Sequence, residues 1–102
     1  MRCDIIDLIK KYLHFLNDVE KVYVFGSVLE QDKIPSDIDV LIIYSEYSNT
    51  IQRQIKEFET QLANETKMSV DLTILSYEEE KQVCFLEKIR KVVDKLLNLK
   101  YT

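Results

Sequence analysis

Two aspartates separated by one residue, Asp37 and Asp39, are the residues of this sequence best suited to do chemistry. In an extended strand alternate side chains leave the same face, so the two carboxylates project together, about 6 to 7 Å apart along the backbone. Carboxylates this close disfavour each other's ionisation unless a cation lies between them. Carboxylate oxygens are the ligands that hard cations such as Mg²⁺ prefer. The pair therefore predicts a site for one divalent cation or for two.

The only glycine of the chain, Gly26, stands directly before Ser27, and nine residues separate that serine from Asp37. Glycine adopts positive φ readily and lets the backbone approach a bulky anion closely. Backbone N–H groups at the start of a short helix after this turn, together with the Ser27 hydroxyl, can bind phosphate oxygens. Phosphate donors that face a carboxylate–Mg²⁺ cluster predict a nucleoside triphosphate site. Two metal ions in such a site favour in-line attack on the α-phosphate with release of pyrophosphate.

Apolar periodicity predicts that helices alternate with the strands that must position these residues. The strongest strand is Asp37–Tyr44, whose near-continuous β-branched residues are typical of a central strand covered on both faces. A capping box of Asn49 and Gln52 begins one helix, and a box of Ser76 and Glu79 begins another that runs to Leu99. The other expected elements are a helix over Asp4–Asn17, a strand over Lys21–Phe25, one helical turn over Ser27–Glu30, a polar loop over Gln31–Ser36 and a strand over Ser69–Leu75.

This order of elements predicts an α+β fold, in which helices pack on a small mixed sheet of three core strands. The helix from Asn49 is long enough for a crossover that returns the third strand parallel and adjacent to the second. Asp71 would then lie beside the aspartate pair at one edge of the sheet. The first strand has to run antiparallel to the second for the Gly26 turn to reach the same edge.

Length and composition limit the classes of protein that fit this site. The 102 residues are expected to form one domain, residues 1–102, and the chain is 46% apolar and 31% charged. Its net charge of −4 argues against stand-alone binding of duplex nucleic acid. Apolar runs are too short to cross a membrane and no signal peptide is visible, so we expect a cytoplasmic protein. Cys3 and Cys84 lie far apart and are interpreted as incidental thiols of a reducing compartment.

Three segments carry a resemblance to a known superfamily: Val22–Ser27, Ser36–Ile42 and Asp71 within Val70–Leu72. In order and spacing they resemble the motifs of the DNA polymerase β-like nucleotidyltransferases, and specifically the minimal nucleotidyltransferases of that superfamily. The resemblance extends from the first expected strand to the third. It implies a polymerase β-type nucleotidyltransferase fold.

The resemblance also implies a role for each site residue. Asp37 and Asp39 would bind two Mg²⁺ ions, with Mn²⁺ as the alternative metal. Asp71 would complete the catalytic metal site and help to activate the acceptor hydroxyl. Gly26 and Ser27 would hold the triphosphate of the nucleotide, which we expect to be ATP.

One position departs from the family's pattern. Many members carry an arginine three residues after the serine, followed by a glycine, and these positions are Glu30 and Gln31 here. Lys33, in the loop that follows, is the cation that we assign to the triphosphate in place of that arginine.

The resemblance implies three functions that stay open at this point. The first is an antitoxin that transfers AMP to a HEPN toxin, as a Mg²⁺-dependent protein adenylyltransferase. A second is an enzyme that makes a nucleotide signal or short oligomer in phage defence, and a third is a catalytically inactive antitoxin that acts by binding, which Glu30 favours. The apolar stripe of the last expected helix fits either the domain's own core or a surface for a partner or a second copy.

Overall fold

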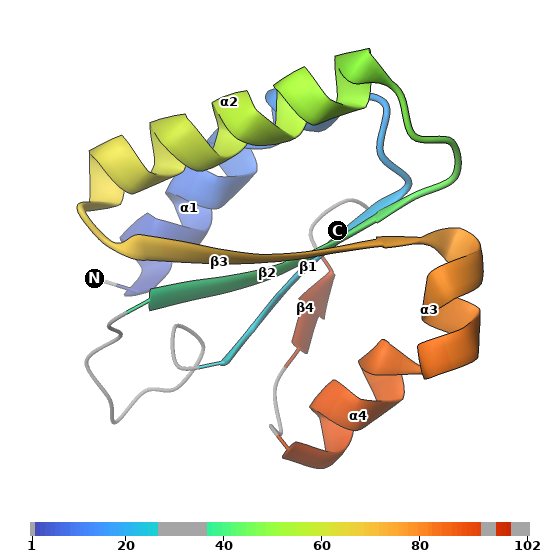
Figure 1. Cartoon of the computed structure of the whole chain (residues 1–102). Coiled ribbons are helices and arrows are strands. Elements are labelled where there is room, and N and C mark those ends of the chain that lie inside the picture. The colour runs from blue at the N-terminus through green and yellow to red at the C-terminus, as the bar shows by residue number, and fades with distance from the viewer. Residues whose placement is uncertain (1, 27–36, 93–95, 99–102) are drawn as a thin grey trace.

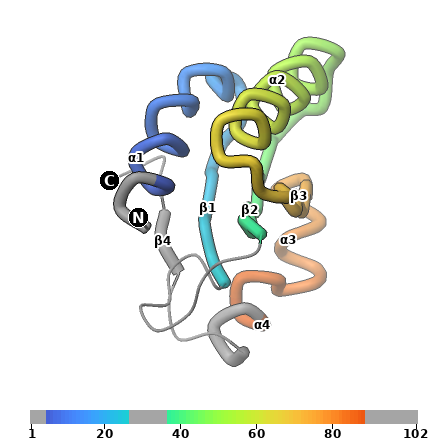
Figure 2. The backbone as a smooth tube through the Cα atoms, turned by 90° about the vertical axis from the view of Figure 1, so that its left-hand side faces the viewer, coloured from blue at the N-terminus to red at the C-terminus, as the bar shows by residue number. Residues whose placement is uncertain are grey.

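The computed structural model describes residues 2–26, 37–92 and 96–98, and Figure 1 shows how they are arranged. In this part of the chain a four-stranded sheet has the order β3-β2-β1-β4. The helices α1 and α2 lie on one side of the sheet, and α3 and α4 lie on the other, as Figures 1 and 2 both show. The elements are α1 (Arg2–Tyr12), a 3₁₀ turn η1 (Leu13–Leu16), β1 (Lys21–Phe25), β2 (Asp37–Tyr44), α2 (Asn49–Thr66), β3 (Ser69–Ser76), α3 (Tyr77–Val83), α4 (Phe85–Val92) and β4 (Leu96–Asn98).

The strand topology expected from the sequence is confirmed. β1 runs antiparallel to β2, with Phe25 opposite Asp39. β3 runs parallel to β2 on its other side, with Asp71 opposite Asp39, after the crossover through α2. These three strands form the expected mixed sheet, and the short strand β4 extends it by pairing antiparallel with β1. The prediction that Leu96–Asn98 continues a helix was therefore wrong.

The main core lies between the sheet and the pair α1 and α2. Alternation along the strands directs one set of β-branched residues toward these helices. The helices direct apolar residues, spaced three or four apart, toward the sheet. Phe58, in the middle of α2, is the largest side chain among those that are fully buried. The buried residues of this core are Ile5, Ile9, Tyr12, Leu16, Val19, Val22, Val24, Ile38, Val40, Ile42, Ile51, Ile55, Phe58 and Leu62.

A second, smaller apolar cluster lies on the opposite face of the sheet. Leu41 and Ile43 of β2 are buried there, which confirms that β2 is covered on both faces. The partly buried residues packed against them are Tyr23, Phe25, Leu75, Phe85 and Leu86. The last two belong to α4, so α4 is the helix that closes this face.

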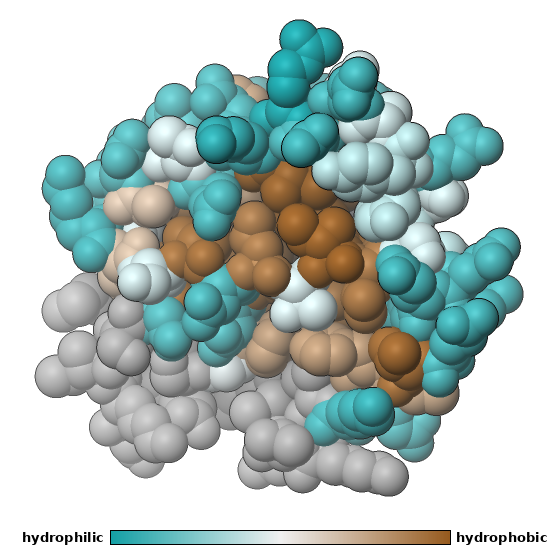
Figure 3. All heavy atoms as spheres, viewed as in Figure 1, coloured by the Kyte–Doolittle hydropathy of each residue, from teal (hydrophilic) through white to brown (hydrophobic). Residues whose placement is uncertain are grey.

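The edge of the sheet formed by β3 remains partly open in the described part of the chain. Val70 and Leu72 are half-buried against the main core, and Ile74 is 39% exposed. Figure 3 shows apolar side chains gathered over this edge, below α2. No helix among the described residues is both long and apolar enough to cross a membrane.

The prediction of a single long helix from Ser76 to Leu99 was wrong, because the helix is interrupted at Cys84. Cys84 adopts the left-handed conformation, with φ of 51°, and its N–H donates to the carbonyl of Glu80 at 2.8 Å. The carboxylate of Glu80 then accepts from the N–H of Leu86 at 2.9 Å, at the start of α4. The break brings Leu86 onto the sheet, whereas Val83, at the end of α3, is 41% exposed.

The first helix also differs in its bounds, since α1 begins at Arg2 and gives way to η1 after Tyr12. The helical turn expected over Ser27–Glu30 and the loop expected over Gln31–Ser36 lie outside the described residues.

The two expected helix caps had different outcomes. The box of Ser76 and Glu79 is confirmed: the Glu79 N–H donates to the Ser76 hydroxyl at 3.0 Å, and the Ser76 N–H donates to the Glu79 carboxylate at 2.9 Å. The box of Asn49 and Gln52 was wrong by one residue. Ser48 has extended backbone and its hydroxyl accepts from the N–H of Ile51 at 3.1 Å, so Ser48 caps α2.

Replacing Ser48 with alanine is expected to destabilise the protein by about 1 kcal/mol, because an N–H of the first turn of α2 loses its acceptor. Asn49→Ala is the matched control and should change the free energy of unfolding by less than about 0.5 kcal/mol. Urea unfolding of both variants at equal pH measures the difference. An equal loss in the two variants would show that the hydroxyl of Ser48 does not cap the helix.

Candidate metal centre

Three carboxylates meet at one end of the sheet, on the face that carries α3 and α4. One oxygen from each of Asp37, Asp39 and Asp71 lies within 4.8 Å of the other two. Asp37 and Asp39 are half-buried, and Asp71 is exposed. The sheet therefore brings together the three aspartates that sequence reasoning singled out.

Strand geometry explains why these side chains converge. Asp37 and Asp39 are alternate residues of β2 and share a face, while Ile38 between them points into the main core. Asp71 of β3 is the direct parallel neighbour of Asp39, and neighbours in adjacent strands project to the same side. The convergence depends on this register, because a slip by one residue would turn the Asp71 carboxylate to the α2 side.

The electrostatics of the cluster are unfavourable without a cation. Burial raises the pKa of the Asp39 carboxyl above its ordinary value of 3.8, and the negative charges of Asp37 and Asp71 raise that pKa further. Both effects disfavour the ionised form. A bound cation would reverse the second effect by placing positive charge among the carboxylates.

The donor set fits a hard divalent cation. All three groups offer carboxylate oxygen, which is the chemistry that Mg²⁺ and Mn²⁺ prefer over nitrogen or sulfur ligands. The exposure of Asp71 leaves one side of the cluster open to solvent, where substrate oxygens could complete the coordination. The residues present therefore fit the metal expected from the sequence.

The remaining predicted site residues have separate outcomes. Gly26 directly follows β1, which ends at Phe25 opposite Asp39, so the glycine lies at the same end of the sheet as the carboxylates. Its φ of +86° is positive, as expected for a turn that needs glycine. Ser27 and Lys33 lie outside the described residues, and their assignment to the triphosphate stays a prediction.

One neighbour of the cluster was missed by sequence reasoning. Phe25 is the antiparallel partner of Asp39, and directly opposite residues share a face, so its ring flanks the carboxylates. Phe25 also packs edge to face against Phe85 of α4, with ring centroids 6.1 Å apart. These rings form an apolar wall beside the charged groups. Phe25 directly precedes Gly26 in the sequence, and this was the signal that could have placed it near the site. Its contact with Phe85 could not be predicted in the same way, because that contact depends on the interruption of the helix at Cys84.

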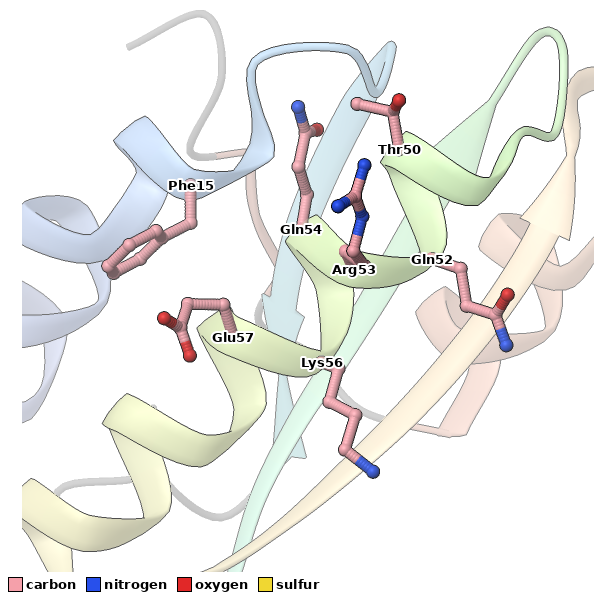
Figure 4. A pocket seen from close by; sticks show the side chains of 7 residues that line it. All are labelled: Phe15, Thr50, Gln52, Arg53, Gln54, Lys56 and Glu57. Carbon is pink, nitrogen blue, oxygen red and sulfur yellow. The ribbon is translucent and has the colours of Figure 1, made fainter.

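A surface hollow of about 670 Å³ lies elsewhere, on the outer side of α2. Figure 4 shows its lining side chains, with Phe15 of η1 facing Glu57 across the gap between the two elements. None of the three aspartates lines it, and α2 covers the sheet face opposite to theirs. The hollow is therefore separate from the metal centre.

Comparison with known proteins links this geometry to a family. The family model described as "Polymerase beta, Nucleotidyltransferase" matches residues 7–96, which include all three aspartates. No curated protein matches the chain.

Solved structures share the fold at low sequence identity. A chain in the structure of a tri-AMPylated HEPN toxin from Shewanella oneidensis in complex with an MNT antitoxin is 22% identical, with a TM-score of 0.61; the match covers 100% of this chain and 74% of that one. A putative nucleotidyltransferase from Sulfolobus solfataricus is 19% identical, with a TM-score of 0.53, over 95% of this chain and 80% of that one. A further crystal structure from Shewanella oneidensis is 19% identical, with a TM-score of 0.54, over 93% of this chain and 71% of that one. At these identities the likeness establishes the fold alone.

Proposed function

The chain belongs to the polymerase beta nucleotidyltransferase family, and from that premise we propose that it is a Mg²⁺-dependent enzyme that transfers AMP from ATP to a hydroxyl group of a partner protein. The observation that carries the proposal is the convergence of three carboxylate oxygens within 4.8 Å of one another, at the same end of the sheet as the turn at Gly26.

The proposed roles follow from position and exposure. Asp37 and Asp39 would hold two Mg²⁺ ions, and Asp71 would join them at one ion. The bound metal would polarise the α-phosphate and offset the charge that develops on the leaving pyrophosphate. Gly26 and Ser27 would hold the triphosphate, with Lys33 as the added cation.

The transfer itself is a substitution at phosphorus. The acceptor oxygen forms a bond to the α-phosphorus, the bond from that phosphorus to the oxygen bridging to the β-phosphate breaks, and pyrophosphate leaves with the electron pair. Asp71 would receive the proton of the acceptor hydroxyl. Its exposure, in contrast to the half-buried Asp37 and Asp39, supports this assignment, because an acceptor protein has to reach the group.

A HEPN toxin is the partner that we propose, in the cytoplasm and as part of a toxin–antitoxin pair. The similar fold in the complex of a tri-AMPylated HEPN toxin with an MNT antitoxin supports this choice. The chain's net negative charge supports a protein acceptor over duplex nucleic acid.

The proposal is tested by incubating the purified chain with ATP labelled at the α-phosphate and Mg²⁺, alone and with a HEPN protein encoded beside it. Label should appear on the HEPN protein, and EDTA or the double substitution Asp37→Ala with Asp39→Ala should abolish it. A labelled oligonucleotide or small nucleotide made by the chain alone would instead support the synthesis of a nucleotide signal.

A non-catalytic antitoxin is the second candidate, favoured by Glu30 at the position where many family members carry arginine. In that case no label would move, while the chain and the double-alanine variant would bind the HEPN protein equally well. Glu30→Arg separates the two candidates further, because added transfer in this variant would point to a phosphate contact that the native chain lacks.

A further inference from the structure

The backbone of Gly26 lies very close to the carboxylate of Asp39 in the metal centre. Its φ of +86° belongs to the left-handed region, and the residue lies half-buried just after β1. An L side chain at this position would direct its first carbon at Asp39, the member of the cluster closest to the turn.

The space for a side chain at position 26 is already filled by the Asp39 carboxylate. A Cβ built on Gly26 would overlap Oδ2 of Asp39 and would lie 3.2 Å from its Cγ and 3.5 Å from its Cβ. The first two contacts are closer than ordinary packing allows, and the third is an ordinary van der Waals distance. The conflict is therefore with the carboxylate group of Asp39 rather than with its backbone.

The described residues around Asp39 leave its carboxylate few alternative positions. Carboxylate oxygens of Asp37 and Asp71 lie within 4.8 Å of it, so rotation toward either brings like charges closer together. Phe25 lies opposite Asp39 on the neighbouring strand, and its ring offers no hydrogen-bond partner to the carboxylate. A side chain at position 26 would thus displace the Asp39 carboxylate from its position beside the carboxylates of Asp37 and Asp71.

We propose that Gly26 is a positioning residue for the metal centre: the absence of its side chain lets the Asp39 carboxylate stand where it converges with Asp37 and Asp71. This role is distinct from holding the triphosphate and acts before any nucleotide binds. It rests on the proposed function only in requiring that the three carboxylates bind a divalent cation.

Metal affinity in the absence of nucleotide is the first test. Gly26→Ala should raise the Kd for Mn²⁺, measured by electron paramagnetic resonance of the free ion, by about tenfold or more, which corresponds to about 1.4 kcal/mol. Ser69→Ala, at the exposed β3 position opposite Asp37, is the control and should leave that Kd within about twofold. Unchanged Mn²⁺ binding by Gly26→Ala would overturn the proposal.

A double-mutant cycle in EDTA separates the overlap from the strain of placing alanine at positive φ. Asp39→Ala removes the two atoms that conflict with a side chain at position 26 and keeps the Cβ that does not. Gly26→Ala should therefore lower the urea midpoint much less in the Asp39→Ala background than in the native one. Equal losses in both backgrounds would mean that backbone strain accounts for the whole effect, which would refute the steric coupling. If Gly26→Ala alone does not fold, the added Asp39→Ala should restore folding, and failure to do so counts against the proposal.

These measurements use no nucleotide, so they separate this inference from the proposed activity. A native protein that binds Mn²⁺ but transfers no AMP would contradict the proposed function and leave the role of Gly26 intact. A native protein that binds no Mn²⁺ would overturn both.

Discussion

Replacing Asp39 with asparagine should reduce nucleotidyl transfer at least about 10³-fold, because it removes a charged oxygen from a site whose chemistry depends on electrostatic stabilisation. The same change should make the metal-free protein slightly more stable at neutral pH. Asp39 is half-buried and faces two other carboxylates, so its charge opposes folding when no cation is present. Loss of activity and gain of stability from one isosteric substitution would identify a group kept for metal binding.

The sign of the pH dependence follows from the raised pKa of Asp39. A raised pKa means that the folded state binds this proton more tightly than the unfolded state. The stabilising contribution of the protonated group is present below the unfolded value, about 3.8, and is lost as pH rises through the folded pKa. In EDTA the advantage of Asp39→Asn over the native chain should therefore be absent in acid and present at pH 7, on the order of 0.5 kcal/mol for a partly exposed group.

Two measurements check this prediction: transfer of labelled AMP with saturating Mg²⁺, and urea unfolding in EDTA at several pH values. Asp7→Asn, at an exposed position of α1, is the matched control and should change neither quantity. A stability advantage that is greatest at low pH, or activity within about tenfold of native, would contradict the assignment of Asp39.

Replacing Phe58 with alanine is expected to destabilise the protein by about 3 to 5 kcal/mol. Phe58 is fully buried in the core between α2 and the sheet, so its replacement by alanine would leave a cavity there. A domain of this size is typically stable by about 5 to 15 kcal/mol, so the variant should lie close to the limit of folding.

Urea unfolding followed by circular dichroism measures the loss for Phe58→Ala. Glu59→Ala, one residue along α2 and exposed, is the control and should change the free energy of unfolding by less than about 0.5 kcal/mol. If both variants unfold at the same urea concentration, Phe58 does not contribute to the free energy of unfolding as its burial predicts.

Local pattern was sufficient to predict the three core strands. The continuous apolar run of Asp37–Tyr44 and the short run of Lys21–Phe25 predicted β2 and β1 with their observed bounds. In a strand the side-chain period is two whatever the surroundings, so the shared face of Asp37 and Asp39 followed from their spacing alone. The crossover length then predicted the parallel neighbour, and with it the position of Asp71 beside the pair.

Local pattern was insufficient to predict helix ends, where alternative hydrogen bonds compete. Asn49 and Ser48 are both good capping residues, and the extended backbone that selects Ser48 is set by how the chain leaves β2. The apolar spacing after Ser76 fits one long helix equally well, but burial of Phe85 and Leu86 on the second face of the sheet requires the turn at Cys84. No feature near Leu96–Asn98 predicted that it would pair with β1.

The sequence by itself therefore determined β1, β2 and β3, the shared face of the aspartate pair and the family motifs, because each depends on residues close together in the chain. Only the tertiary structure decided which helix closes the second face and how near Gly26 comes to Asp39. Those facts depend on strand register and on packing between distant segments, where a carboxylate on β2 occupies the space that a side chain on the preceding turn would need.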